Sequence, residues 1–258
     1  MPIQRHFANS DLAEMVDISN GMVINTDFIH KFGRNPNIGG APETIWMNGG
    51  IYTYLDAPST VYVTSNSADD AAAGTGARTV TVQGLDNNYE QVEETLTVGG
   101  PVSTIEFLRI FRAFVETAGS IKTNVGNVKI TTGAGGTGTV LADIGIIGTG
   151  TTFGLGQTQL ALYTIPAHCT GYLTRWNNGV GAYNSSATIT LLTRQIEEVT
   201  KAFRTRDIMD VPGGWHVRDY EIPIRLPPKT DVEIRAIAST GSNVSSSFDI
   251  VLVTGPGQ

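Results

Sequence analysis

Hydrophobic and polar residues alternate with a period of two over most of this chain from residue 59 onward. Such alternation, rich in β-branched residues, is typical of β-strands that bury one face. It is clearest in STVYVTS (59–65), ARTVTVQGL (77–85) and SSATITLLTRQ (185–195). In the second of these segments Val80 and Val82 fall on the same side of the strand, so we predict that both face the core.

The remaining periodic segments extend this pattern to the C-terminus. TIEFLRIFRAFVET (104–117) has the length of a helix, but its β-branched and aromatic residues favour one long strand. QLALYTIPAHCTGYLTRWNNGV divides into two strands at Pro166, and two more lie on either side of the Pro227-Pro228 turn. We therefore expect about ten to twelve strands, spaced as in a sandwich or barrel. The predicted fold class is all-β: an antiparallel β-sandwich or jelly roll with an extended N-terminal arm.

Residues 1–50 differ from the rest because glycine and proline interrupt any alternation there. Ser10 can cap one short helix that reaches Val16. The segment keeps large apolar residues that a disordered tail would lack. We therefore divide the chain into an extended arm with one short helix, residues 1–50, and a jelly-roll-like body, residues 51–258, with room for two sub-sheets or lobes. The arm is expected to lie on its own body, on a neighbour or on both, through five predicted interface residues: Phe28, Phe32, Ile38, Ile45 and Trp46.

Composition and charge argue against two classes of partner. The chain has 258 residues, of which 16% are charged, against about 25% in an average globular domain. Its formal net charge is −7, which does not suit binding to a phosphate backbone. No apolar run approaches the ~20 residues of a membrane-spanning helix, and the N-terminus lacks the apolar core of a signal peptide. We therefore expect a protein that is made in a cytoplasm and binds neither nucleic acid nor a membrane.

The stretch SADDAAAGTGARTVTVQGLD (67–86) contains the residues that most resemble a ligand site. Asp69 and Asp70 are adjacent, whereas a calcium loop needs acids at alternate positions and a closing Glu. A hairpin that brings Asp86 close is the remaining route to a calcium site. Gly74-Thr75-Gly76 leads straight into a strand, so no helix N-terminus is available to hold a phosphate. We predict a solvated acidic loop, and no metal or cofactor.

The sequence shows no recognisable catalytic pattern. It contains no GxSxG motif. The single cysteine, Cys169, follows His168, and neighbours on a strand point to opposite sides, so we expect a buried or half-buried thiol. A pair of carboxylates assembled from distant strands, as in glycoside hydrolases, stays open. We expect that the protein is not an enzyme.

Aromatic residues beside glycine and asparagine, in WNNGVGAYN (176–184) and PGGWHVRDY (212–220), indicate exposed loops. Exposed aromatic rings suit a protein interface or a sugar-binding face. Aromatic rings that close the ends of a sandwich are the structural alternative. The aromatic pattern alone does not choose between these three.

Three runs together resemble a group of virion proteins from tailed phages of marine and freshwater origin. They are PSTVYVTSNSADDAAAGTGARTVTVQGLDNNYEQVEETLTVGG, FLRIFRAFVETAGS and GLGQTQLALYTIPAHCTGYLTRW, and the resemblance covers roughly residues 32–176. It implies a β-sandwich or jelly roll that decorates the capsid exterior as cement, commonly as a trimer where major capsid subunits meet. It implies no catalytic residue.

From the residues and this resemblance together we expect a phage virion structural protein. It would bridge major capsid subunits as a symmetric homo-oligomer, expected to be a trimer, and would be assembled into the virion in the host cytoplasm. A two-faced apolar strand such as FDIVLV (248–253) fits a subunit with core on one side and a neighbour on the other. The alternative is a tail- or fibre-associated β domain that binds a host surface glycan.

Overall fold

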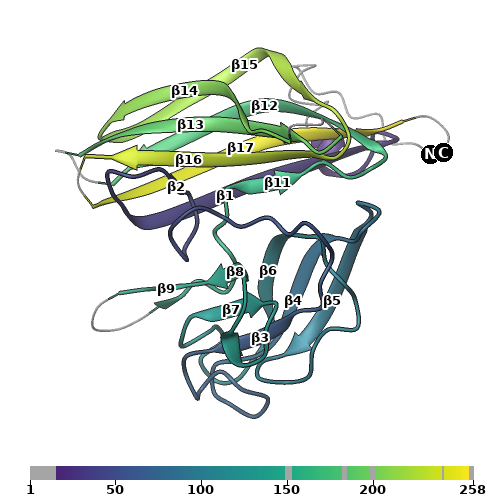
Figure 1. Ribbon diagram of the computed structural model, residues 1–258, viewed down its shortest axis with the longest axis vertical. Helices are drawn as coiled ribbons and strands as arrows, with labels where there is room; N and C mark the ends of the chain where they lie inside the picture. The colour runs from purple at the N-terminus through teal and green to yellow at the C-terminus, as the bar shows by residue number, and fades with distance from the viewer. Residues whose placement is uncertain (1–15, 149–152, 182–184, 198–200, 240, 256–258) are drawn as a thin grey trace, which may run out of the picture.

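The protein is built almost entirely of antiparallel strands, arranged in two lobes (Figure 1). The computed structural model describes residues 16–148, 153–181, 185–197, 201–239 and 241–255. The predicted all-β sandwich is confirmed. The chain does not run through the lobes in order, because the upper lobe contains both its early and its late strands.

The upper lobe is a sandwich of two sheets. One sheet, called sheet A below, has the order β1 (Thr26–Ile38), β17 (Ser242–Thr254), β12 (Cys169–Val180) and β15 (Gly214–Leu226). The other, sheet B, has the order β11 (Leu162–Thr164), β16 (Thr230–Ala238), β13 (Ser186–Gln195) and β14 (Arg204–Pro212), and β2 (Glu43–Thr44) also pairs with β16.

The pairing of these strands is that of a jelly roll. If β2 is set aside, the first strand of the lobe pairs with the eighth, the second with the seventh, the third with the sixth and the fourth with the fifth. Contacts between β17 and β12, and between β16 and β13, complete the two sheets. Eight strands folded in this way form the double-sheet architecture found in viral capsid and lectin domains.

The lower lobe is an insertion between β2 and β11, so it separates the first strand of the jelly roll, β1, from the second, β11. It contains two three-stranded sheets, one of β3 (Tyr62–Ser65), β7 (Val128–Thr131) and β8 (Val140–Ile144), and one of β5 (Gln91–Thr97), β4 (Ala77–Leu85) and β6 (Arg109–Ala118). A separate two-stranded hairpin, β9 (Ile146–Ile147) and β10 (Phe153–Gly154), projects from it. A short 3-10 helix spans Ala134–Gly136.

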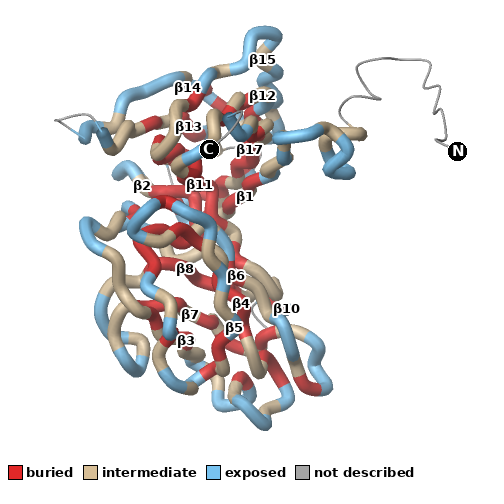
Figure 2. The backbone as a smooth tube through the Cα atoms, turned by 90° about the vertical axis from the view of Figure 1, so that its right-hand side faces the viewer, coloured by how far each residue is buried: buried red, intermediate tan, exposed pale blue. Residues whose placement is uncertain are grey.

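Each lobe has its own hydrophobic core, visible as the buried segments in Figure 2. Trp176 and Tyr163 are the largest side chains of the upper core. The lower core includes Val80 and Val82, both fully buried as predicted. The strand predicted at 104–117 is present as β6, although regular pairing begins only at Arg109.

The arm predicted over residues 1–50 is much shorter in the structure. Thr26–Ile38 is a full strand of sheet A, because its residues pair with β17 along almost its whole length. The described segment before β1, residues 16–25, begins with a helical turn at 16–19 and contains no buried residue, and Figure 2 shows it leaving the upper lobe. Most of the helix predicted from Ser10 to Val16 lies outside the described residues.

Candidate functional site

The junction of the two lobes is held by a buried ion pair. Arg109 on β6 reaches Asp231 on β16 with two hydrogen bonds, Nε to Oδ1 at 3.0 Å and Nη2 to Oδ2 at 3.3 Å. The same carboxylate accepts hydrogen bonds from Arg194 Nε at 3.0 Å and from Thr164 Oγ1 at 2.6 Å. Burial lowers the pKa of Arg109, but Asp231 outweighs it, so the pKa of this guanidinium lies above its ordinary value.

A second buried carboxylate extends this junction along β16. Glu233 accepts a hydrogen bond from Arg235 Nε at 2.7 Å and one from Thr44 Oγ1 at 2.6 Å. The ring of Tyr54 lies 4.4 Å from the guanidinium of Arg194. Because every buried carboxylate here is paired with an arginine and a hydroxyl, we read the cluster as a structural connection between the lobes rather than as acid–base machinery.

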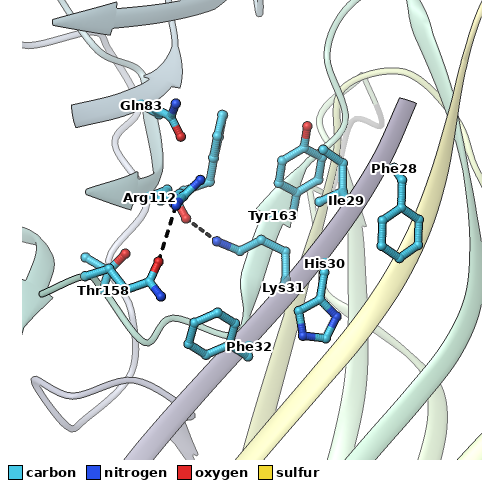
Figure 3. A pocket seen from close by; sticks show the side chains of 11 residues that line it. Phe28, Ile29, His30, Lys31, Phe32, Gln83, Arg112, Thr158 and Tyr163 are labelled. Carbon is cyan, nitrogen blue, oxygen red and sulfur yellow. Dashed lines mark hydrogen bonds between the residues drawn. The ribbon is translucent and has the colours of Figure 1, made fainter. Parts of the chain in front are cut away.

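A cleft of about 350 Å³ opens beside this junction, between β1 and the lower lobe (Figure 3). Lys31 projects into it from β1 and donates to the Phe111 carbonyl oxygen. Burial lowers the pKa of Lys31 to about 7, and the neighbouring charge of Arg112 adds to this effect. Arg112 Nη2 contacts Gln157 Oε1 at 3.4 Å. The basic side chains that line the cleft are His30, Lys31 and Arg112, and no described residue of the lining is Asp or Glu.

Three of the five predicted interface residues lie inside the protein. Ile38 and Ile45 are 0% exposed in the upper core, and Trp46 is 3% exposed in a smaller cluster beside it. These three predictions are wrong, because side chains enclosed by their own chain cannot contact a partner. Phe28 and Phe32 are only partly buried and lie on the outer face of sheet A, where an interface role stays a prediction.

Asp70 is a structural residue that the sequence did not reveal. It is 4% exposed, and its carboxylate accepts hydrogen bonds from the backbone N–H groups of Ala77, Val125 and Gly126 at 2.8, 2.9 and 2.8 Å. Asp69, beside it, is exposed. The predicted solvated loop is therefore correct for Asp69 and wrong for Asp70, which ties two loops of the lower lobe together.

The glycines of the same loop are required by close approach rather than by a ligand. A Cβ atom on Gly74 would lie 2.0 Å from the Asp69 carbonyl oxygen, and one on Gly76 would lie 2.1 Å from Asp70 Oδ1. Either contact is far shorter than atoms tolerate. The Gly-Thr-Gly run thus lets the loop fold tightly around the Asp70 carboxylate.

Cys169 and His168 do not form a reactive pair. The Cys169 thiol is half-buried, as predicted, and burial raises its pKa, which lowers its nucleophilicity. His168 Nε2 instead lies 2.8 Å from Glu90 Oε1. Among the described residues, no three His, Cys, Asp or Glu side chains gather as metal ligands would. No helix in the described part of the chain is long and apolar enough to cross a membrane.

Large apolar side chains are exposed on several sides of the molecule. They occur on the segment before β1, on the β9–β10 hairpin, on β14, β15 and β16, and on two loops; they are Met22, Ile24, Ile51, Ile121, Ile147, Phe153, Ile208, Trp215, Val217, Ile222 and Ile237. In the β9–β10 hairpin, Phe153 and Ile147 are direct cross-strand partners. A two-stranded hairpin is marginal on its own, so an exposed apolar pair on it indicates a contact surface.

Comparison with known proteins adds little to this geometry. No family model matches the chain, and no curated protein matches it. Two solved structures that align with it are that of the infectious bursal disease virus Gx strain and that of the infectious bursal disease virus VP2 subviral particle. Each alignment has 10% identity and a TM-score of 0.24, and covers 90% of this chain and 73% of the other. At that TM-score neither alignment bears on the fold or the function.

Proposed function

We propose that this chain is a structural subunit of a virus particle. In this proposal it decorates the capsid exterior of a tailed phage and stabilises the shell by bridging major capsid subunits as a symmetric homo-oligomer, expected to be a trimer. It would be incorporated in the host cytoplasm. The role requires no chemical step, so it assigns no catalytic residue and no cofactor.

The observation that carries the proposal is the distribution of exposed apolar side chains. A monomer in solution gains nothing from Phe153 at 67% exposed, Ile222 at 87% or Ile24 at 85%. These residues lie on three separate elements, the hairpin, β15 and the segment before β1. A subunit with neighbours on more than one side would bury all three, and closed symmetric oligomers are the common way to do so.

Two further features support the same role. The buried Arg109–Asp231 pair connects the lobes, so a load applied to one lobe would be transmitted to the other. The jelly roll is an architecture used by capsid proteins, which is an analogy at the level of fold and does not by itself assign a function.

Native mass spectrometry of the purified chain tests the proposal. We expect a closed homo-oligomer, and we expect Phe153→Ser to weaken it at least about tenfold, because an aromatic anchor at an interface commonly contributes more than 1.4 kcal/mol. Phe153→Tyr is the matched control, since it keeps most of the apolar surface, and it should assemble normally. A wild-type chain that stays monomeric at all concentrations would contradict the proposal.

The alternative role, a tail- or fibre-associated domain that binds a host surface glycan, is favoured by one observation only. That observation is a trough on the outer face of sheet A. The trough is compatible with either location in a particle, so it is considered separately below.

A further inference from the structure

We propose that the outer face of sheet A binds a saccharide in a shallow trough centred on Trp215. The trough has a volume of about 460 Å³, which is within the range of small-molecule sites, roughly 300–1,000 Å³. We call it the Trp215 trough and define it by the side chains that matter for binding, Phe32, Arg34, Gln159, Asn177, Trp215 and Ser245.

Strand register explains why a trough forms there. Two rows of four paired residues cross the outer face from β15 to β1, and they are Trp215–Gly179–Ser245–Arg34 and Val217–Asn177–Ser247–Phe32. In both rows the two middle strands carry small or short polar residues, while the two edge strands carry large ones. The edge strands are three strand spacings apart, about 14 Å. The result is a polar floor between raised sides.

Trp215 presents a flat aromatic surface on one side of this floor. Its cross-strand partner is Gly179, where a Cβ atom would lie 2.5 Å from Trp215 Cε3. Glycine is therefore required at this position for the indole to lie against the sheet. Trp215 is nevertheless 57% exposed, so the other face of its indole is open to a ligand.

Polar groups that lack partners lie along the same trough. The Gln159 amide and the Ser245 hydroxyl make no hydrogen bond to any described residue. Arg34 donates only through Nε, to Asn243 Oδ1 at 2.8 Å.

The next row of the outer face consists of residues that are already paired. Arg175 is paired with Asp219 and His30 with Asp249, each at 2.5 Å. On this side, therefore, the trough is bounded by groups that already have partners.

This combination fits a saccharide better than a protein partner. The C–H face of a sugar ring is attracted to the negative face of an indole, and its hydroxyl groups donate to and accept from amides and hydroxyls. The core of a protein interface is instead depleted in serine, whereas this floor contains Ser245 and Ser247. A partner strand cannot add to the floor, because its backbone groups already pair within the sheet.

The inference is separate from the proposed structural role. The Trp215 trough lies on the upper lobe, whereas the hairpin used to test oligomer formation projects from the lower lobe. Loss of sugar binding and loss of oligomer formation can therefore be measured independently, and failure of one does not imply failure of the other.

Tryptophan fluorescence gives a direct test. Of the three tryptophans, Trp46 and Trp176 are 3% and 0% exposed, so an added ligand would change mainly the emission of Trp215. The full chain is titrated with the tetrasaccharides of glucose, galactose and N-acetylglucosamine. We expect saturable binding of at least one of them.

Calorimetry with the sugar that binds then compares the variants. Trp215→Ala should weaken binding at least tenfold, and Gly179→Ala should weaken it as well because the added Cβ displaces the indole. Trp215→Phe keeps a ring and should retain part of the affinity. Ile121→Ala, at an exposed site of the lower lobe that does not line the trough, is the control and should bind normally. Absence of binding to all three sugars, or equal affinity in folded Trp215→Ala, overturns the proposal.

Discussion

Arg109 and Asp231 form a two-point ion pair across the junction of the two lobes, with side chains that are 4% and 0% exposed. Arg109→Leu leaves the buried Asp231 carboxylate with fewer compensating donors, so we expect a loss of about 3 kcal/mol or more in the free energy of unfolding. Chemical denaturation measures this loss.

The exposed pair Arg175–Asp219 is the matched control for that variant. Its side chains are 51% and 63% exposed, so solvent screens the interaction, and Arg175→Leu should cost less than about 1 kcal/mol. Equal losses in the two variants would show that the buried pair does not hold the lobes together.

Asp70 and Asp69 are adjacent acids with opposite roles. Asp70→Ala removes a carboxylate that accepts three backbone N–H groups and the Ser65 hydroxyl, and the buried N–H groups are left unpaired. We expect a loss of about 3 kcal/mol or more in stability. Asp69→Ala should change stability by less than about 0.5 kcal/mol, because that residue is exposed. Thermal melts of the two variants, measured side by side, check both values.

Asp143 on β8 is an acid that the fold disfavours in its charged form. Its Oδ1 has no hydrogen-bond partner among the described residues, and its Oδ2 lies 4.0 Å from Lys129 Nζ. Burial raises its pKa from 3.8 to about 6, against the smaller opposite effect of Lys129. The folded state therefore binds the proton more tightly than the unfolded state. Stability falls as pH rises from about 4 to 6, and the whole cost is present above pH 6.

Asp143→Asn abolishes this titration. Relative to the wild type, the variant should gain stability as pH rises from 4 to 7, by at most about 3 kcal/mol. Denaturation curves at a series of pH values measure the gain. Asp56→Asn, at an exposed acid, is the matched control variant. A stability difference that does not vary with pH would show that Asp143 is not buried as described.

The segment before β1 is the part of the predicted arm that can still contact a partner. Removing residues 1–24 deletes the exposed Met22 and Ile24 but keeps Asn25, whose carbonyl oxygen accepts the Thr254 N–H at 2.8 Å. We expect the fold to survive and the affinity for expanded capsids to fall at least about tenfold. A cosedimentation assay measures this affinity. Full-strength binding by the truncated chain would exclude the segment as a contact.

Removing residues 1–45 would not test the segment before β1 by itself. That deletion takes away β1 together with Ile38 and Ile45, and so removes a strand of sheet A and part of the upper core. Loss of binding by that variant would follow from unfolding as readily as from loss of an arm.

Local pattern was enough to predict the class of fold. Alternation identified β4 and the core positions Val80 and Val82, and Pro166 marked the break before β12, because both signals depend on neighbours in the sequence. The same logic misjudged β1. Gly33 looked like an interruption, but a Cβ there would lie 2.3 Å from the Ala161 backbone nitrogen, so glycine is needed for two segments to pass.

The connections between distant segments could not be predicted in this way. Arg109 and Asp231 are 122 residues apart, and Asp70 and Gly126 are 56 apart. No local period brings such residues together, since the jelly roll pairs early strands with late ones and places a whole lobe between β2 and β11. The sequence predicted exposed loops around Trp176 and Trp215, but both residues lie in strands and Trp176 is fully buried. Trp215 is exposed, and the trough beside it depends on the register of four strands.

The copy number of this chain in purified virus particles tests the central claim most directly. Quantitative mass spectrometry can compare its amount with that of the major capsid protein. A decoration protein that bridges capsid subunits should be present at a fixed ratio of the same order as the capsid protein itself. Absence from the particle, or the few copies expected of a tail component, would contradict the account.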